Sequence, residues 1–160
     1  DIIWNAPLNR WEISFDVLGF SGFFVKTIGI PLNSNWASID AISYESTIQS
    51  GIFIIGDSQG TAQPKAGHIG NSEAKICADA ILRKINNLDL YPNPKTNSAC
   101  YSPVSRTQAS WLTAVYEYDS TTKNMKVVNG ANYPISGSAS TKNYSKMFEW
   151  STNLFADTFK

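Results

Sequence analysis

Hydrophobic and polar residues follow one another in blocks along this chain, and the sharpest block lies near its middle. Residues 52–55 are consecutive β-branched or aromatic residues that no polar residue interrupts. A run of this kind is typical of a strand that is buried on both faces of a parallel or mixed sheet. The polar, glycine-rich residues 58–67 that follow are expected to form a loop.

A helical pattern comes after this loop. We expect Asn71 and Ser72 to cap its first turn, and residues 86–87 to end the helix. The free N–H groups and the positive dipole end of that first turn favour an electron-rich ligand atom. The apolar face of the predicted helix consists of residues at three- and four-residue spacing, namely Ala74, Cys77, Ala78, Ile81 and Ile85.

The rest of the chain predicts a small sheet that a helix covers. Two prolines in residues 88–95 indicate a stiff connector between two units. Residues 111–117 alternate as a strand, and residues 126–128 are expected to return as its hairpin partner. Residues 143–159 predict a helix whose apolar stripe covers one face of the sheet and forms core.

Length and charge limit the classes of function. With 160 residues the chain can form one ordinary domain or two small ones, and we expect an α+β fold with units in residues 1–90 and 91–160. The 13 basic and 13 acidic residues balance, and no basic stripe indicates binding to nucleic acid. No apolar run approaches the roughly 20 residues that a membrane span needs.

The N-terminal region adds two expectations. Residues 15–25 are rich in apolar and aromatic side chains, which are either buried in ordinary packing or covered by another part of the molecule or a second copy of the chain. We find no Gly-x-Gly-x-x-Gly between a strand and a helix, so the dinucleotide-binding half of a nucleotide fold is not recognisable. We therefore expect this sequence to be the C-terminal part of a larger protein.

Few residues are candidates for chemistry. Gly56 and Asp57 end the predicted strand, and the Asp57 carboxylate either accepts hydrogen bonds from a ribose or ribityl hydroxyl or serves as a turn residue. Cys100 is expected in a polar loop, as a redox-active thiol or as an ordinary free or bonded cysteine. Cys77, on the apolar helix face, is expected to be an inert core thiol. The only histidine, His68, is expected to be solvated or bonded to backbone, and the sequence lacks the ligand spacing of a metal site.

Taken in order, the residues of this chain resemble the flavoprotein subunit of flavocytochrome c sulfide dehydrogenase. The resemblance begins near Trp36 and extends to the C-terminal end of the sequence. Its matching residues are Trp36, Asp40, Glu45-Ser46-Thr47-Ile48, Gly51-Ile52, Ile55-Gly56-Asp57, Pro64-Lys65-x-Gly67, Asn71-Ser72, Lys75, Asn97-x-x-Cys100-Tyr101-Ser102, Ala114-Val115-Tyr116 and Asp157-Thr158-Phe159.

This resemblance implies a fold and a set of site residues. Residues 1–90 would be the remnant of an FAD-domain sheet with its flavin-facing helix, and residues 91–160 a small flavin-binding unit of sheet and helix. Cys100 would be the redox-active cysteine, with a disulfide partner in the missing N-terminal half of the flavoprotein. His68 stands where the family generally has an aromatic residue, so a catalytic role for it is not expected. The residues expected to bind the cofactor are Gly56, Asp57, Lys65, Gly67, Asn71 and Ser72.

The resemblance also implies an activity. The parent protein would oxidise sulfide at a disulfide beside FAD, and it would pass electrons to a c-type cytochrome subunit in the periplasm. The chain alone is expected to bind FAD weakly or not at all, because the phosphate-binding half is not found. The alternative is a non-catalytic binding or subunit-interface module without a bound cofactor, which the neutral charge and the five tryptophans are compatible with.

Overall fold

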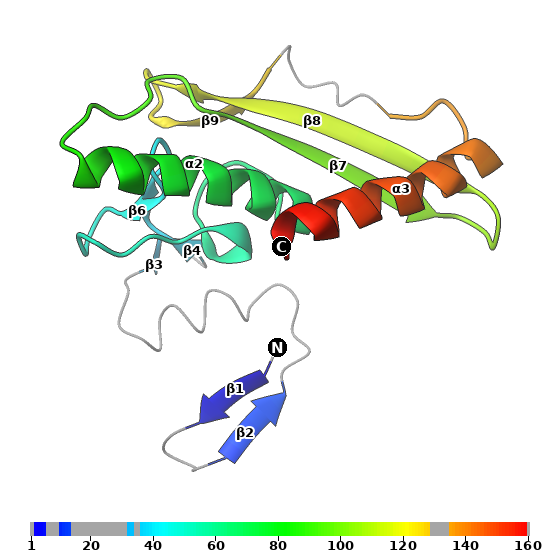
Figure 1. The fold of residues 1–160 in the computed structure, drawn as a ribbon, viewed down its shortest axis with the longest axis horizontal. Coiled ribbons are helices and arrows are strands. Elements are labelled where there is room, and N and C mark those ends of the chain that lie inside the picture. Colours follow the sequence, from blue (N-terminus) through cyan, green and yellow to red (C-terminus); the bar gives the residue numbers. More distant parts are fainter. Residues whose placement is uncertain (1, 6–9, 14–31, 34–35, 129–134, 160) are drawn as a thin grey trace.

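The structure is a computed structural model, and it describes residues 2–5, 10–13, 32–33, 36–128 and 135–159. The apolar residues 15–25 lie outside the described residues, so the expectations about their packing and about a homodimer stay predictions. Figure 1 shows the order of the elements along the chain.

The described N-terminal part consists of short antiparallel pairs. Strand β1 (Ile2–Asn5) pairs with β2 (Arg10–Ile13). The two pairs that follow are β3 (Leu32–Asn33) with β4 (Trp36–Ala37), and β5 (Ile39–Asp40) with β6 (Glu45–Ser46).

The predicted central strand at residues 52–55 is wrong. Phe53 forms only an isolated bridge to Glu45, and Ile52 and Ile55 are 37% and 38% exposed, while Ile54 is buried. A strand buried on both faces needs a neighbour along each edge, and the backbone hydrogen bonds of this segment lead back to residues 44–46 and 49. This run of apolar residues is therefore only partly buried in the described fold.

The C-terminal half contains a three-stranded antiparallel sheet, in the order β7-β8-β9. The pairing of β8 (Ala109–Asp119) with β9 (Asn124–Val127) confirms the predicted hairpin. The edge strand β7 (Lys95–Pro103) was not predicted, because its residues are mostly polar and lack an apolar alternation. Its polar side chains are nevertheless buried in part, since Thr96 and Ser98 are 2% and 3% exposed.

The main core lies between one half of this sheet and the start of helix α2 (Gly67–Ile85). Ser98 and Ala114 are paired across β7 and β8, as are Thr96 and Tyr116, so these side chains share one face of the sheet. The buried residues that pack together in this core are Ala41, Ile69, Ala114, Tyr116 and Met125. The core therefore joins residues from both predicted units.

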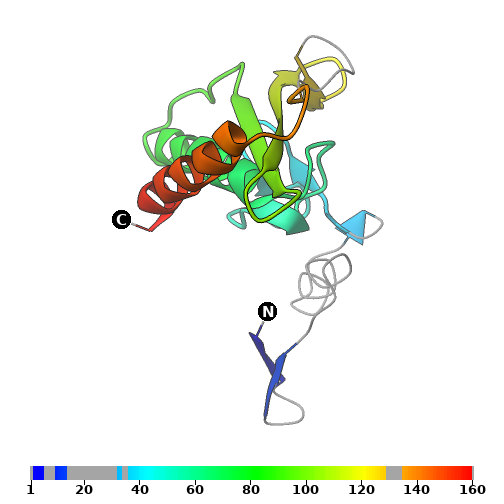
Figure 2. The ribbon, with the colours of Figure 1, turned by 90° about the vertical axis from the view of Figure 1, so that its right-hand side faces the viewer.

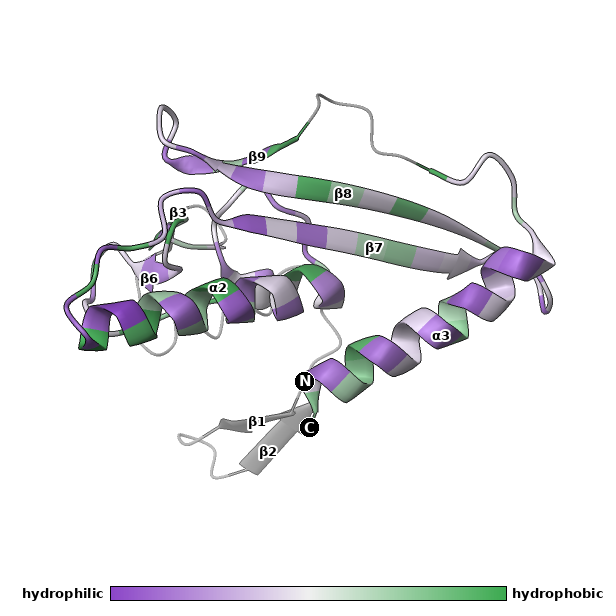
Figure 3. Cartoon of the chain, turned by 45° about the horizontal axis from the view of Figure 1, so that its top comes forward, coloured by the Kyte–Doolittle hydropathy of each residue, from purple (hydrophilic) through white to green (hydrophobic). Residues whose placement is uncertain are grey.

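The C-terminal helix α3 (Thr141–Thr158) lies on the same side of the sheet as α2, and its C-terminal end comes close to the start of α2 (Figures 1 and 2). Ser140 caps it, because its side chain accepts a hydrogen bond from the Asn143 N–H. The prediction that its apolar stripe forms core is wrong, since α3 has no buried residue and Phe148 and Phe155 are 53% and 60% exposed. Figure 3 shows these apolar residues interspersed with polar ones along the helix.

Candidate functional site

The short 3-10 turn η2 (Gly56–Ser58) carries the first predicted site residues. Gly56 has a φ of +70°, in the left-handed region that glycine adopts without strain. A Cβ placed on Gly70 of α2 would lie 3.4 Å from the Gly56 Cα, so a glycine there lets the turn approach the helix closely. Gly56 and Asp57 were predicted to end a strand; they form a turn that α2 supports, but residues 52–55 before it form no strand.

Hydrogen bonds to Glu73 of α2 hold this turn against the helix. It is 0% exposed, and its carboxylate accepts hydrogen bonds from the Gly56 N–H at 2.6 Å and from Gln59 Nε2 at 2.9 Å. Burial raises the pKa of Glu73 to about 7, although both hydrogen bonds and the nearby Lys65 oppose this shift. Sequence reasoning missed Glu73, but one signal was present: it lies one helical turn from both Ile69 and Cys77, on the face that the fold buries.

Lys65 lies close to the same turn. Its ammonium donates a hydrogen bond to the Gln59 carbonyl oxygen and lies 5.4 Å from the ring centroid of Trp36. Burial lowers the pKa of Lys65, while the negative charges of Glu73 and Asp57 partly restore it. The structure therefore brings the predicted residues Gly56, Asp57 and Lys65 together, around a carboxylate that was not predicted.

The helix starts one turn earlier than predicted, at Gly67. Its N-cap is Ala66, which makes no side-chain cap bond, so the predicted capping by Asn71 and Ser72 is wrong. Both side chains have other partners. Ser72 donates to the Asn97 carbonyl oxygen and side-chain oxygen, at 3.1 and 3.0 Å, and Asn71 donates to Thr158 Oγ1 at 3.0 Å. They connect α2 to β7 and α3 instead of closing its first turn.

His68, in the first turn of α2, links the start of the helix to the edge strand β7. Its Nδ1 accepts a hydrogen bond from the Ala99 N–H at 2.9 Å, which confirms the prediction of a backbone-bonded histidine. Its ring also meets Trp150 edge-on, with 5.9 Å between centroids. Burial lowers the pKa of His68, which favours the neutral imidazole that this hydrogen bond requires.

Cys100 follows directly after Ala99, within strand β7, so the prediction of a loop cysteine is wrong. It is half-buried and pairs with Leu112, which is 40% exposed. Cys77 is buried on α2 and burial raises the pKa of its thiol, as expected for an inert core cysteine. Both cysteines are free thiols, so the structure holds no Cys77–Cys100 bridge.

A buried polar chain joins the loop before α2 to the strand that carries Cys100. Tyr44 donates from its hydroxyl to Gln63 Oε1 at 2.8 Å, and Gln63 Nε2 donates to Thr96 Oγ1 at 2.5 Å. Burial raises the pKa of Tyr44, so its hydroxyl stays a donor. Sequence reasoning missed this chain, because its members are far apart in the sequence and only folding brings them together.

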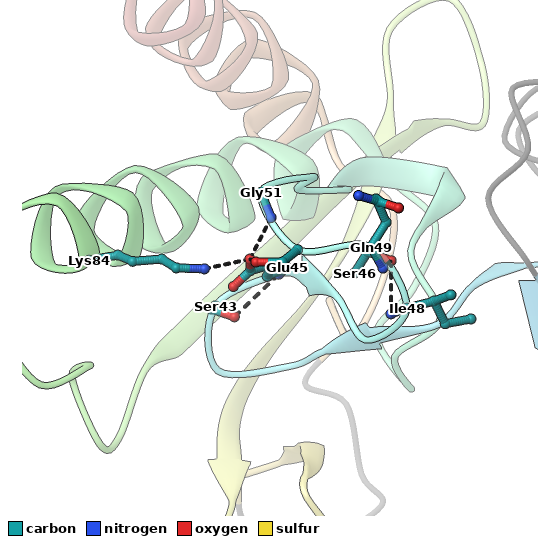
Figure 4. A network of polar contacts seen from close by, with 8 residues as sticks. Ser43, Glu45, Ser46, Ile48, Gln49, Gly51 and Lys84 are labelled. Carbon is teal, nitrogen blue, oxygen red and sulfur yellow. Dashed lines mark hydrogen bonds and ion pairs between the residues drawn. The ribbon is translucent and has the colours of Figure 1, made fainter.

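Glu45 makes a separate network at the other end of α2 (Figure 4). Its Oε1 accepts from the Gly51 N–H at 2.7 Å and forms an ion pair with Lys84 Nζ at 2.6 Å. These bonds, the Gly51 one foremost, lower the pKa of Glu45. This residue of the ordered sequence match therefore has a structural role in holding the loop before residue 52 against α2.

An open polar cleft of about 570 Å³ lies between α2, β7 and α3. His68, Asn97, Tyr101 and Trp150 line it, and an ion pair of 2.6 Å between Lys75 and Asp157 lies at its α3 side. Within the described part of the chain, no group of at least three His, Cys, Asp or Glu side chains is arranged to hold a metal ion. Among the same residues, no helix has the length and apolar character to cross a membrane.

A comparison with protein families adds evidence for the second half of the chain. Residues 92–159 match the family described as flavocytochrome c sulphide dehydrogenase, flavin-binding. The matched region contains β7, β8, β9 and α3, and Cys100 lies within it. The match therefore supports a flavocytochrome c sulfide dehydrogenase flavin-binding region as the C-terminal portion of this 160-residue chain.

Proposed function

We propose that this chain is the C-terminal portion of a flavin-dependent sulfide dehydrogenase, an FAD enzyme that oxidises sulfide at a disulfide and passes electrons to a c-type cytochrome. The flavin-binding family match of residues 92–159 supports the flavin, and the family's name is that of a flavocytochrome. Sulfide as substrate, the periplasm as location and the assignment of single residues belong to the proposal.

The observation that carries this proposal is the hydrogen bond between His68 and the Ala99 N–H, at 2.9 Å. It holds the residue before Cys100 against the first turn of α2, so the candidate cysteine lies next to the helix end that is expected to face the flavin. In the sequence these two features are far apart. The fold brings Cys100 close to the start of α2, and a thiol that exchanges electrons with a flavin must lie close to the flavin site.

The residues around the start of α2 fit a flavin. A Cβ placed on Gly67 would meet nothing within 4 Å, so there is open space beside the free N–H groups of the first turn. Asp57 would accept hydrogen bonds from ribityl hydroxyls, and the half-exposed Ile55 offers an apolar surface. Lys65 would balance negative charge on the cofactor. A bound flavin would accept two electrons and would pass them one at a time to a haem.

Cys100 would form half of a reactive disulfide. The family resemblance implies that the second half would come from the N-terminal half of the parent flavoprotein, while Cys77 is buried on α2. A hydrosulfide ion attacks one sulfur of the disulfide: a new S–S bond forms, the old one breaks, and the displaced cysteine leaves as a thiolate with the electron pair. A thiolate leaving from Cys100 would lie in β7, one residue after the Ala99 N–H that His68 of α2 binds.

The exposed apolar residues of α3 support the second candidate function, a subunit-interface module. Phe148, Phe155 and Phe159 are 53%, 60% and 77% exposed, and a stripe of this kind is typical of a surface that a partner covers. The two functions are compatible if the partner is the cytochrome subunit. The subunit-interface function would apply without the flavin function only if the intact protein carried no flavin.

The absorption spectrum of the intact protein that contains this chain tests the proposal. We expect a visible band of oxidised flavin that bleaches when sulfide is added, because electrons from sulfide reduce the flavin. Sulfite or thiosulfate at the same concentration serves as the control for unspecific reduction. A protein without a flavin band would leave the interface module as the better assignment.

A further inference from the structure

Glu73 is a buried ionisable group that the proposed chemistry does not use. Its two carboxylate oxygens have one hydrogen-bond donor each: Oε2 faces the Gly56 N–H, and Oε1 faces the side-chain amide N–H of Gln59. An ionised carboxylate only accepts hydrogen bonds, whereas a protonated one carries an O–H that needs an acceptor. Both neighbours are donors, so the arrangement matches the ionised form.

Full burial, in contrast, disfavours the ionised form of Glu73. The free energy of removing a carboxylate from water favours its protonated form, and Glu73 is 0% exposed. Among the ionisable groups near it, Lys65 favours the charge and Asp57 disfavours it. The pKa of Tyr44 is raised, so this neighbour stays neutral. Burial outweighs Lys65 and the two hydrogen bonds, and it raises the pKa of Glu73 to about 7.

The turn that Glu73 holds is a single 3-10 turn of three residues. None of the residues of η2 is buried, so apolar packing does not fix its position. Gly56 itself has the conformational freedom of glycine and a φ of +70°. The hydrogen bond from the Gly56 N–H to Glu73 is a direct polar link between this turn and α2.

We propose that Glu73 is a positioning residue of the flavin site: its ionised carboxylate holds the Gly56–Ser58 turn in the shape that binds flavin, and proton uptake by that carboxylate loosens the turn. This inference rests on the proposed flavin-binding function, and it adds a dependence of flavin affinity on pH. Asp57 follows Gly56 directly, so any movement of the turn moves the carboxylate that is expected to bind the ribityl chain.

The test measures the dissociation constant of FAD for the intact protein across pH 6 to 8, by dialysis of the flavin-depleted form. For the wild type we expect a several-fold tighter affinity at the alkaline end, with a midpoint near the pKa of about 7. Glu73→Gln offers one acceptor and one donor to two donors, so one hydrogen bond is lost at every pH. Its affinity should be weak and independent of pH over this range.

Glu45→Gln is the matched control. Glu45 also accepts a backbone N–H, from Gly51, but it lies with Lys84 at the other end of α2 (Figure 4). Its replacement should leave the pH profile of FAD affinity unchanged. If Glu73→Gln does not fold, Gln59→Leu replaces it: the loss of one donor disfavours the carboxylate, and the midpoint should move to higher pH.

The outcomes separate this inference from the proposed function. Wild-type protein that binds no FAD at any pH would overturn the proposed function itself. Wild-type protein that binds FAD with a profile that Glu73→Gln or Gln59→Leu leaves unchanged would overturn only the positioning role of Glu73. A loss of the pH dependence in Glu73→Gln, with Glu45→Gln unchanged, supports both.

Discussion

At the scale of single residues, the two cysteines of this chain occupy contrasting environments. Cys77 is 7% exposed on the core side of α2, where burial raises the pKa of its thiol. Cys100 is half-buried in β7, beside the first turn of α2. Thiol reactivity follows thiolate formation and access, so the fold makes Cys100 the candidate for redox chemistry and Cys77 a packing residue.

We predict that Cys100→Ser in the intact protein abolishes turnover with sulfide. Serine neither forms a disulfide nor releases a thiolate near neutral pH, while its small size should leave flavin content largely intact. Stopped-flow measurement of flavin bleaching, with flavin content as the folding control, checks this. Normal sulfide turnover in Cys100→Ser would remove the catalytic assignment of this cysteine.

Cys77→Ser serves as the matched comparison. A hydroxyl without a partner in the apolar core should lower the free energy of unfolding by roughly 1–3 kcal/mol. Sulfide turnover per folded, flavin-loaded molecule should stay at the wild-type value. A loss of turnover as complete as in Cys100→Ser would contradict the division of roles between the two thiols.

At the scale of elements, α2 completes the open edge of the three-stranded sheet. An edge strand presents unpaired backbone groups, and two side chains of α2 bind those of β7: His68 accepts from the Ala99 N–H, and Ser72 donates to the Asn97 carbonyl oxygen. The helix thus holds the Cys100-bearing strand with polar contacts, in addition to the apolar contact of Ile69.

We predict that His68→Phe lowers the free energy of unfolding by about 1 kcal/mol at pH 8, because the Ala99 N–H loses its acceptor. The folded state lowers the pKa of His68 from 6.5, so its contribution is complete above pH 6.5 and is lost as the pH falls below that value. The difference between wild type and variant should therefore shrink toward pH 5. Urea unfolding at several pH values measures it, and a difference that is constant with pH would contradict this role.

The contribution of Glu73 to stability changes with pH in the opposite direction, over an overlapping pH range. Its folded-state pKa is raised from 4.5 to about 7, so its contribution to stability is complete below pH 4.5 and is lost as the pH rises toward 7. This group is present in both wild type and His68→Phe. The comparison between those two proteins therefore isolates the histidine.

At the scale of the whole molecule, the two predicted units share one core. Ile69 and Ala41 come from residues 1–90, while Ala114, Tyr116 and Met125 come from residues 91–160. The predicted boundary falls in the connector between α2 and β7, yet the packing crosses it. The apolar residues of α3 take no part in this core, which leaves them available to a partner.

We predict that Ile69→Ala lowers the free energy of unfolding by roughly 2–5 kcal/mol, because it opens a cavity in the shared core. Phe155→Ala should change it by no more than about 0.5 kcal/mol, since this side chain is 60% exposed. Thermal or urea unfolding of the chain measures both. A cost for Phe155→Ala as large as that for Ile69→Ala would show that α3 packs its apolar stripe within the molecule.

The sequence by itself determined the elements whose patterns are local. The helix after the glycine-rich loop, the β8–β9 hairpin and the C-terminal helix follow from spacing and turn chemistry. The ordered residues around Cys100 pointed to the flavin-binding family. Each of these depends on residues that are neighbours along the chain.

Only the tertiary structure decided which side chains are buried and which polar groups meet. Strand β7 has a polar sequence, and it forms because β8 pairs with one edge and α2 binds the other. Residues 52–55 are apolar, but the described fold places no second strand beside them. In the sequence Glu73 resembles a solvated helix residue, but in the fold its carboxylate accepts hydrogen bonds from Gly56 and Gln59. Burial and hydrogen bonding are set by residues distant in sequence, and local patterns carry no information about those distances.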